Sequence, residues 1–422
     1  CAVIGDGEEV VVELCATVRA SKASGENRAA LLKRLAAIEG IYVPSHFRVS
    51  YQADGRIEAI TAKDPQQPKV RRRVLADLDS APYPEQPIVP FLETIHDRVA
   101  IEVARGCTRG CRFCQAGYIY RPVRERQPDT IRNLIDQLLK HSGYDEVSLL
   151  SLSTGDYSAI ETLMQNLMGC YADQSIAVSL PSLRVGSLTP ELMNEIKKVR
   201  KTGFTLAPEA GSERLRQVIN KGINAEDLVD SATTAFELGW RIIKLYFMIG
   251  LPTETDEDLD ALVELAARVK KAGKGTQGGA DVNVSVSTFV PKAHTPFQWE
   301  AQISYEETIA RQEMLRGALK KKRLRLKWHD AELSFLEGVF ARGDRRLGAV
   351  LEEAVKQGCR FDGWREHFRY DIWMEAFVKA EIDPAWYLRQ RLPGEIFPWE
   401  HIDAGVSRDF LVRERQAALL GK

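Results

Sequence analysis

Three of the seven cysteines lie within eight residues, in the run Arg105-Gly106-Cys107-Thr108-Arg109-Gly110-Cys111-Arg112-Phe113-Cys114. The spacing is C-x3-C-x2-C, and it follows directly on a predicted strand at Val99–Val103. Thiolates are the ligands of iron–sulfur clusters, and three of them on one short loop can reach three corners of one cubane. No fourth cysteine stands at a matching spacing, so one iron is left open for an exogenous ligand. We therefore predict a 4Fe-4S cluster on Cys107, Cys111 and Cys114.

Other interpretations of these cysteines fit less well. A structural zinc ion needs four protein ligands, and His96, the nearest histidine, is upstream and badly spaced. The remaining cysteines are scattered and are expected to be small buried hydrophobes; they are Cys1, Cys15, Cys170 and Cys359. An odd number of cysteines with this distribution argues against a disulfide framework and predicts a reducing, cytoplasmic location.

The elements that must position the cysteines alternate regularly from about Val99. Six predicted strands are separated by helices; they cover residues 99–103, 146–152, 176–180, 203–207, 241–249 and 282–289. Such alternation is typical of parallel strands joined by helical crossovers. Six units, not eight, favour an α/β fold with a partial parallel β/α barrel over a closed one.

The flanking segments have other patterns. Helices are predicted at 10–20 and 25–40, and Asp54-Gly55 predicts a hairpin between strands 46–51 and 57–61. After Gln302 the strands are expected to stop, with helices at 305–322, 330–342, 345–357 and 362–380 and an irregular stretch from Pro384 onward. Trp364, His367, Phe368, Tyr370, Trp373 and Phe377 recur at helical spacing and are predicted to form the core of this C-terminal part, with a lid over the substrate as the alternative.

The amino-acid composition limits the classes of binding partner that are expected. The 422 residues carry a formal net charge of -1 with 44% hydrophobic and 28% charged residues, as in ordinary globular proteins. No apolar run is long enough to cross a bilayer, so no membrane partner is expected. Lys320 to Lys327 holds six basic residues in eight, followed by Trp328, which could bind RNA. A solvated helix end followed by a strand is the favoured interpretation, and no clear nucleic-acid signature is present.

The cysteine motif, with Phe113 before its last cysteine and a barrel strand before the loop, resembles the signature of the radical S-adenosylmethionine (SAM) superfamily. That resemblance implies a SAM molecule whose amino and carboxylate groups chelate the open iron. It further implies reductive cleavage to a 5′-deoxyadenosyl radical, driven by a one-electron reductant such as flavodoxin or ferredoxin. Phe113 would then lie near the adenine.

Four further segments at predicted strand ends support the resemblance and supply the expected SAM contacts. Thr154, Gly155 and Asp156 follow the second strand, where the family has a glycine-rich segment that meets the SAM amino group. Ser179 and Arg184 belong to the segment Ser179-Leu180-Pro181-Ser182-Leu183-Arg184 at the end of the third strand, with Arg184 suited to the SAM carboxylate. Glu209, chosen over Glu213, ends the fourth strand, and Gly250 belongs to the strand-five element whose backbone holds the adenine.

Residues outside the barrel resemble uncharacterised bacterial radical SAM proteins that have a cobalamin-binding domain. The start of the chain, Gly5-Asp6-Gly7-Glu8-Glu9, is similar to the last strand and loop of such a domain, and residues 288–299 and 399–405 match as well. His294 and Trp299, just past the last barrel strand, are either contacts for a substrate or partner or parts of a turn. The resemblance implies four segments: a cobalamin-domain remnant (1–24), a connector with a hairpin (25–92), the radical SAM core (93–325) and a C-terminal helical domain (326–422). It also implies a chain cut from a longer one, in which cobalamin is a further cofactor.

Several functions stay open at this stage. The first is a radical SAM enzyme, with cobalamin-linked methylation of an unknown substrate ahead of methylthiotransferase-like modification of RNA or protein. Against the latter stand the lack of a second cysteine set upstream of Cys107 and the helical C-terminus. A function of another class is a non-catalytic iron–sulfur redox sensor or binding protein, and a zinc-stabilised RNA-binding protein is the third. The substrate is a small molecule, an RNA or a protein, and no further catalytic residue is assigned.

Overall fold

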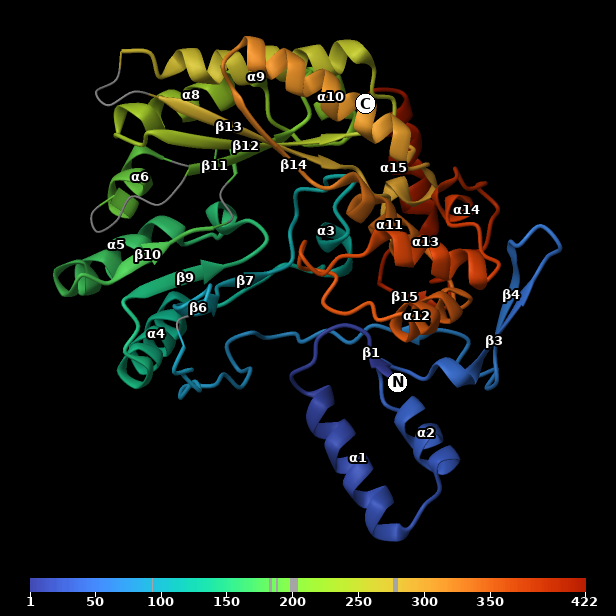
Figure 1. Cartoon of the computed structure of the whole chain (residues 1–422). Helices are drawn as coiled ribbons and strands as arrows, with labels where there is room; N and C mark the ends of the chain where they lie inside the picture. Colours follow the sequence, from blue (N-terminus) through green and yellow to red (C-terminus); the bar gives the residue numbers. More distant parts are fainter. Residues whose placement is uncertain (93, 182–183, 187–188, 198–203, 276–279) are drawn as a thin grey trace.

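Two parallel sheets form the centre of the molecule (Figure 1). The computed structural model describes the whole chain except residues 93, 182–183, 187–188, 198–203 and 276–279. The first sheet has the order β10-β9-β6, with β6 (Val99–Glu102), β9 (Glu146–Leu150) and β10 (Ala177–Ser179). The second has the order β11-β12-β13-β14, with β11 (Phe204–Glu209), β12 (Ile242–Ile249), β13 (Asp281–Thr288) and β14 (Arg325–Trp328). All of the pairings within the two sheets are parallel.

Helices connect the strands in the alternation that the sequence predicts. They are α4 (Pro128–Ser142), α5 (Ile160–Tyr171), α6 (Pro190–Lys197), α7 (Glu213–Val218), α8 (Ala225–Glu237), α9 (Asp256–Ala272) and α10 (Tyr305–Lys321). The α/β class is confirmed, and the strands follow one another in chain order, as in part of a β/α barrel. Among the described residues no ladder joins β10 to β11. Gly203 of the fourth predicted strand and residues 198–201 of the preceding helix lie outside the described part.

The predicted end of the strands at Gln302 is wrong, because β14 extends the second sheet. Its residues pair with β13 from Asn283↔Arg325 to Val286↔Trp328. Arg325, Lys327 and Trp328 are exposed at this edge, where basic side chains discourage further strand pairing. The basic residues from Lys320 to Lys327 therefore belong to a helix end and an edge strand. This is the interpretation that was favoured over RNA binding.

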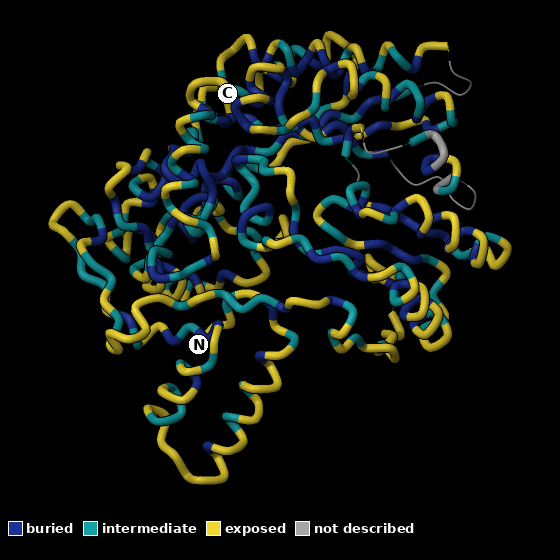
Figure 2. Tube along the Cα trace, turned by 180° about the vertical axis from the view of Figure 1, so that it is seen from behind, coloured by how far each residue is buried: buried dark blue, intermediate teal, exposed yellow. Residues whose placement is uncertain are grey.

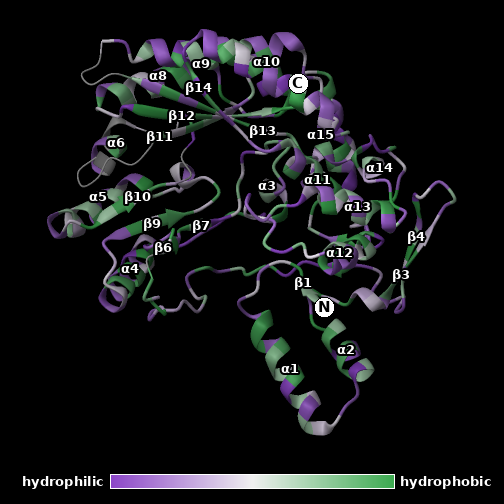
Figure 3. Cartoon of the chain, in the orientation of Figure 1, coloured by the Kyte–Doolittle hydropathy of each residue, from purple (hydrophilic) through white to green (hydrophobic). Residues whose placement is uncertain are grey.

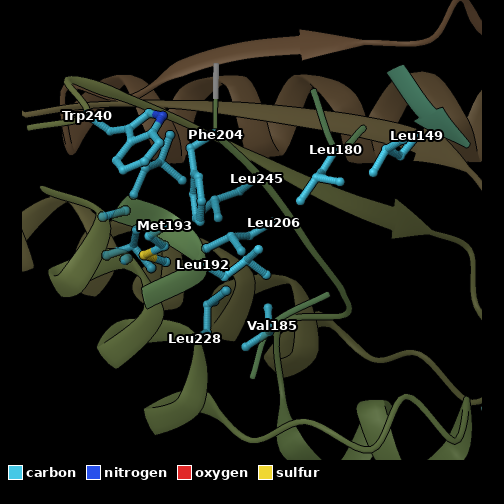
Figure 4. Packing of buried hydrophobic residues seen from close by; sticks show 14 of the residues in the cluster. Leu149, Leu180, Val185, Leu192, Met193, Phe204, Leu206, Leu228, Trp240 and Leu245 are labelled. Carbon is cyan, nitrogen blue, oxygen red and sulfur yellow. The ribbon is translucent and has the colours of Figure 1, made fainter. Parts of the chain in front are cut away.

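One hydrophobic core joins the two sheets and their helices. Burial follows the periodicity of each element: Ile131, Leu134, Ile135 and Leu138 face inward from α4 at helical spacing, and alternate residues of β13 are buried. Figure 4 shows Leu180, at the end of β10, in the same cluster as Phe204 and Leu245 of the second sheet. In Figure 2 the buried residues gather in the interior of the molecule, whereas the helical hairpin of residues 10–36 is mostly exposed, and β9 and β12 are coloured mainly as hydrophobic in Figure 3.

The N-terminal part contains a helical hairpin and a β-hairpin, as predicted. The helices α1 (Val10–Ser24) and α2 (Arg28–Ala36) project from the body in Figure 1, and β1 (Ala2–Val3) pairs with β2 (Ile41–Tyr42). The second helix begins later than predicted because the side chain of Asn27 accepts a hydrogen bond from the backbone N–H of Ala30. The strands β3 (Phe47–Tyr51) and β4 (Ile57–Ala62) form the antiparallel hairpin. The two-residue strand β5 (Val70–Arg71) pairs with β15 (Ile402–Asp403) of the C-terminal part.

The C-terminal part is helical. The prediction of an irregular stretch from Pro384 onward is wrong, because helices occur there as well. Its helices are α11 (Ala331–Arg342), α12 (Leu347–Lys356), α13 (Tyr370–Lys379), α14 (Ala385–Leu388) and α15 (Arg408–Leu419). The last of them begins at the Ser407 cap, whose hydroxyl accepts from the N–H of Phe410. Helix α13 starts eight residues later than expected, so Trp364 and His367 are exposed and not core, whereas Trp373 and Phe377 are buried in a cluster with Phe335.

A buried ionic network ties the N-terminal segment to the strands before and after the cysteine loop. These short strands are β7 (Ala104–Arg105) and β8 (Arg124–Glu125), which pair antiparallel. Asp6 accepts from Arg124 at 2.5 Å and from the N–H of Leu75 at 2.7 Å, and it lies 3.0 Å from Arg105. Burial alone would raise the pKa of Asp6, but the hydrogen bonds from these three groups outweigh it and hold that pKa below its ordinary value.

Breaking this network is expected to destabilise the fold strongly. The side chains of Asp6 and Arg124 are each 6% exposed, so Arg124→Met leaves a buried carboxylate with one cation fewer, at a cost of about 3–5 kcal/mol. The cost is expected to shrink as the pH falls through the acidic range, because the depressed pKa of Asp6 contributes stability only while Asp6 is ionised. Urea unfolding at several pH values measures both effects. The control is Arg56→Met, which removes an exposed pair with Asp54 and is expected to cost less than about 1 kcal/mol. Equal losses in the two variants would contradict the prediction.

No helix of the described residues is both long enough and apolar enough to cross a bilayer.

Candidate functional site

The cysteine loop begins where β7 ends and is shaped by two glycines with positive φ. Gly106 has φ +94°, and a Cβ there would lie 2.6 Å from the carbonyl oxygen of Tyr120. Only glycine fits that close approach without a shift of the backbone. Gly110 has φ +71°, and its carbonyl accepts from the side-chain amide of Asn220 at 3.0 Å. The loop then enters the short helix α3 (Ala116–Ile119). Its path is therefore fixed at both ends of the C-x3-C segment.

All three motif cysteines line one cavity of about 300 Å³ at the carboxyl ends of the strands. Cys107, Cys111 and Cys114 are partly buried free thiols. Burial raises the pKa of the Cys111 and Cys114 thiols, and the positive charge of Lys221 opposes that shift. Binding of iron would remove these thiol protons outright.

Residues from six strands or loops complete the wall of the cavity. They are Arg109, Phe113, Leu152, Ser153, Pro181, Arg184, Thr205, Ala207, Glu209, Lys221 and Tyr246. Three of these are cations, Arg109, Arg184 and Lys221, against the single carboxylate of Glu209. A positively charged wall suits a cluster whose thiolate ligands make it anionic and a ligand that carries a carboxylate.

Two of the basic residues are held by acidic neighbours. The Nε of Arg109 donates to Asp156 at 2.7 Å, and Ser153 donates to the same carboxylate at 2.6 Å. Burial would raise the pKa of Asp156, but the hydrogen bonds from Arg109 and Ser153 hold it below its ordinary value. Lys221 lies 3.2 Å from Glu209, and its ammonium is 5.9 Å from the ring centroid of Phe113. The Glu209–Lys221 pair therefore stands beside the aromatic residue of the cysteine motif.

Glu209 has a backbone conformation that glutamate rarely adopts. Its φ is +67°, and it is the last residue of β11 that pairs with β12, just after a register shift. Burial raises the pKa of its carboxyl, although Lys221 pulls the other way. Left-handed non-glycine residues are costly and cluster at functional sites, so this strained, largely buried carboxylate is the strongest candidate for a ligand contact in the cavity that the cysteines line.

Comparison with known proteins identifies the family to which this part of the chain belongs. Residues 101–266 match the family described as the Radical SAM superfamily. Residues 101–266 form a radical SAM domain. Residues 1–44 match a second family, described as radical SAM proteins, N-terminal. The resemblance seen in the cysteine motif is thereby confirmed.

Two relatives show the extent of the similarity. The chain is 38% identical over 253 residues to an uncharacterised protein of Methanocaldococcus jannaschii, with 60% of this chain and 53% of that protein covered. It is 25% identical over 346 residues to the ribosomal protein uS12 methylthiotransferase RimO of Thermotoga maritima, with 75% and 74% covered. Among solved structures, the radical SAM methyltransferase TsrM of Kitasatospora setae has a TM-score of 0.44 at 14% identity, with 67% and 52% covered. The chain thus spans about half the length of the first and third of these proteins.

A radical SAM domain implies a 4Fe-4S cluster and SAM, and the residues present fit the cluster. Three thiols share one cavity, and the other four cysteines are far from the motif in sequence. Among the described side chains, no three His, Cys, Asp or Glu residues converge on a point that could hold a single metal ion. A cubane takes each thiolate on a different iron, so its ligands do not need to converge.

The structure brings most of the predicted site residues together. The three cysteines, Phe113, Arg184 and Glu209 line the cavity, and Asp156 reaches it through Arg109 and Ser153. Arg184 donates to the carbonyl of Gly222 at 3.0 Å. Ser182 and Leu183 of the same predicted segment lie outside the described residues.

Asp156 itself and four further predicted SAM contacts do not line the cavity, and their roles stay predictions. Thr154 is fully buried and donates to the carbonyl of Leu149, and Gly155 stands beside it in a 3-10 turn. The hydroxyl of Ser179 faces the carbonyl of Val147 at 3.4 Å. The N–H of Gly250 donates to Glu254 at 2.8 Å.

The sequence did not single out Lys221 or Arg109. Lys221 follows helix α7 and not a strand, so it could not be predicted from the rule that functional residues lie at the ends of strands. Arg109 lies inside the cysteine motif, and this position is the feature of the sequence that could have identified it as a site residue. The sequence left open whether His294 and Trp299 contact a substrate or partner or belong to a turn. The structure places His294 in a turn, where its N–H donates to Gln298, and Trp299 in the core, where it is 1% exposed.

The C-terminal helix α15 contacts the cysteine loop directly. Arg112, between Cys111 and Cys114, is 5% exposed; its Nε donates to Glu414 at 3.1 Å, and its Nη1 donates to the carbonyls of Gln217 and Val218. One arginine therefore ties the loop both to the end of α7 and to a helix 302 residues away.

Loss of this arginine is expected to loosen the cluster. Arg112→Met should make a reconstituted cluster disappear severalfold faster in the presence of an iron chelator, because the loop loses one buried and two partly buried hydrogen bonds, worth about 1 kcal/mol each. The decay is followed by the visible absorbance of the cluster. Arg413→Met, an exposed position on the same helix, is the matched control and should decay like the parent protein. If the two variants decay alike, Arg112 does not hold the loop.

Proposed function

We propose that this protein is a radical SAM enzyme that binds a 4Fe-4S cluster on Cys107, Cys111 and Cys114 and uses it to cleave SAM reductively. The observation that carries the proposal is the single cavity that holds these three thiols, three cationic side chains and the strained carboxylate of Glu209. When bound, the cluster supplies the electron that breaks a carbon–sulfur bond of SAM and yields the 5′-deoxyadenosyl radical.

The chain's own residues bind and orient the reactants. Arg184 and Lys221 offer positive charge to the carboxylate of SAM. Glu209 can accept hydrogen bonds from the SAM amino group or ribose hydroxyls, and Phe113 offers an apolar face to the adenine. The roles of Thr154, Gly155, Asp156, Ser179 and Gly250 in SAM binding are part of the proposal, with Asp156 acting through Arg109. A one-electron reductant such as flavodoxin or ferredoxin is the proposed partner, and a reducing cytoplasm is the proposed location.

The reaction that follows the radical is proposed to be methylation, with cobalamin bound in a longer form of the chain. The division of the chain at residues 24/25, 92/93 and 325/326 is part of this proposal, and the match of residues 1–44 to the family described as radical SAM proteins, N-terminal, supports a separate segment before the core. A methylthiotransferase is the second candidate, because RimO covers three quarters of the chain. Within residues 1–106 the cysteines are Cys1 and Cys15, and both are exposed, not buried as predicted.

The deciding experiment is electron paramagnetic resonance of the anaerobically reconstituted and reduced protein, with and without SAM. A four-iron signal that shifts when SAM is added, with 5′-deoxyadenosine formed under reductant, is the expected result. A cluster whose signal ignores SAM would favour the redox sensor, and a preparation that binds zinc and no iron would remove both iron-based functions. Sulfur transfer to product in place of methyl transfer would select the methylthiotransferase.

A further inference from the structure

Glu209 and Lys221 form their ion pair from two segments that have a helix between them. Glu209 is the last residue of β11, and Lys221 follows helix α7. Ala210 and Gly211 continue the chain from Glu209 towards that helix. Any group that holds these two segments together therefore also fixes the geometry of the pair.

One side chain of α7, that of Arg216, is bonded to both segments. Its Nη1 donates to the carbonyls of the two residues that follow Glu209, at 3.1 and 2.8 Å. Its Nε donates at 3.2 Å to the carbonyl of Ile223, two residues after Lys221. Its own carbonyl accepts a hydrogen bond from the N–H of Lys221 at 2.9 Å. Arg216 thus links the segment that bears the carboxylate to the segment that bears the ammonium.

The backbone of Glu209 needs support of this kind. Its φ of +67° is costly for a residue with a side chain, and such conformations persist only where the surroundings fix them. Helix α9 closes the following turn on its other side, because a Cβ on Gly211 would lie 2.2 Å from the backbone nitrogen of Leu262. The turn is therefore held between α9 and the guanidinium of Arg216.

This guanidinium is costly to bury for stability alone. Arg216 is 2% exposed, its Nη2 has no hydrogen-bond acceptor among the described residues, and its acidic neighbour Glu213 is 3.8 Å away and 60% exposed. Burial lowers the pKa of Arg216; the carboxylate of Glu213 opposes that shift, and the like charge of Arg268 adds to it. A buried charge with so little compensation is weak evidence for a role in stability. Its bonds to the carbonyls of two segments indicate a role in geometry.

We propose that Arg216 is a positioning residue for SAM binding, which holds Glu209 and Lys221 against each other so that SAM meets a preformed pair. Arg216 is not among the residues that line the cavity, so it acts through these two. A preformed pair binds more tightly because less free energy is spent on ordering it when the ligand arrives. The inference rests on the proposed function, since it assigns a further residue to the same site.

Equilibrium dialysis of SAM against the cluster-loaded protein tests the proposal. Arg216→Met should raise the dissociation constant of SAM by about tenfold, as the loss of one charge-assisted contact does, with the cluster content unchanged. Equal affinities in the parent and in Arg216→Met overturn the proposal.

The matched control is Arg342→Met, at another buried arginine that holds backbone carbonyls. Arg342 is fully buried in the C-terminal part, and it donates to the carbonyls of Tyr387 and Arg389, each at 2.7 Å. Its replacement should lower the urea concentration at which the protein unfolds but leave SAM binding within about twofold of the parent, because contacts outside the site contribute additively. Equal weakening of SAM binding in the two variants would mean that any buried arginine has this effect, and the proposal would be wrong.

A double-mutant cycle separates positioning from a general loss of structure. In a Glu209→Gln background, Arg216→Met should change the dissociation constant of SAM by less than about twofold, because the pair that it positions is already broken. Full additivity of the two losses would contradict the proposal. Arg216→Lys serves as the second variant if Arg216→Met does not fold. It keeps the charge but lacks the planar fork that reaches both segments, so SAM binding should again weaken severalfold.

Hydrogen exchange of the cluster-loaded protein without SAM gives a result that does not depend on SAM. The amide hydrogens of residues 219–223 should exchange severalfold faster in Arg216→Met than in the parent, with no such change in Arg342→Met. Unchanged exchange rates in Arg216→Met would show that Arg216 does not hold the segment. If the parent fails to bind SAM, the proposed function fails, and the exchange rates still decide whether Arg216 joins the two segments. If SAM is cleaved and binds equally to the parent and Arg216→Met, the enzyme stands and the role of Arg216 is refuted.

Discussion

Replacement of any one of Cys107, Cys111 and Cys114 by serine is expected to abolish the cluster and SAM cleavage together. Each thiolate holds a different iron, and a serine hydroxyl does not deprotonate readily to replace it. Residues that act as one unit lose nearly the whole effect when a single member is removed. We expect 5′-deoxyadenosine formation to fall by about a thousandfold or more, with loss of the visible absorbance and of the paramagnetic signal of the reduced protein.

Cys170→Ser is the matched control for the cysteine variants. Cys170 is an exposed free thiol on α5, so its replacement should leave both the cluster and the cleavage unchanged. A single motif variant that keeps a four-iron signal would mean that another side chain supplies a ligand. In that case the site would have four protein ligands available, as the sensor alternative requires, and the proposal of an open iron would be wrong.

The cysteine motif could be predicted from the sequence because everything that defines it is local. The ligands lie within eight residues, and the glycines that shape the loop lie between and beside them. The alternation of strands and helices could be predicted from the sequence equally well, because each strand of a parallel sheet is a short apolar run between amphipathic helices. Glu209 was chosen because its segment resembles one of the family's SAM-contacting segments and ends a strand, where sites of such sheets are built; its role in SAM binding stays a prediction.

Contacts between distant segments could not be predicted. Arg112 meets Glu414 across 302 residues, and Lys221 reaches Glu209 from a loop that follows a helix. Nothing in either local sequence indicates these partners. Helix α15 was missed for a related reason: it buries little more than Leu411 and Ala418, so its periodicity is weak.

Removal of the carboxylate of Glu209 is expected to weaken SAM binding with little effect on the cluster. Hydrogen bonds to a charged group contribute about 1.5–3 kcal/mol, which corresponds to an increase of about 10–100-fold in the dissociation constant of SAM for Glu209→Gln. Lys221→Met should act in the same direction, because it leaves the buried carboxylate without its cation at 3.2 Å. Equilibrium dialysis of SAM against the cluster-loaded protein measures the affinity, and visible absorbance measures the cluster content.

Glu213→Gln separates the role of Glu209 from that of any nearby acid. Glu213 lies four residues further along at the start of α7, its side chain is 60% exposed, and it accepts a hydrogen bond from the N–H of Ala225 outside the cavity. Its replacement should leave SAM binding within about twofold of the parent, since a surface acid outside the site contributes little. If Glu213→Gln weakens SAM binding and Glu209→Gln does not, the strained φ of Glu209 serves only to place Lys221, and the ligand contact at the end of β11 belongs to the neighbouring acid.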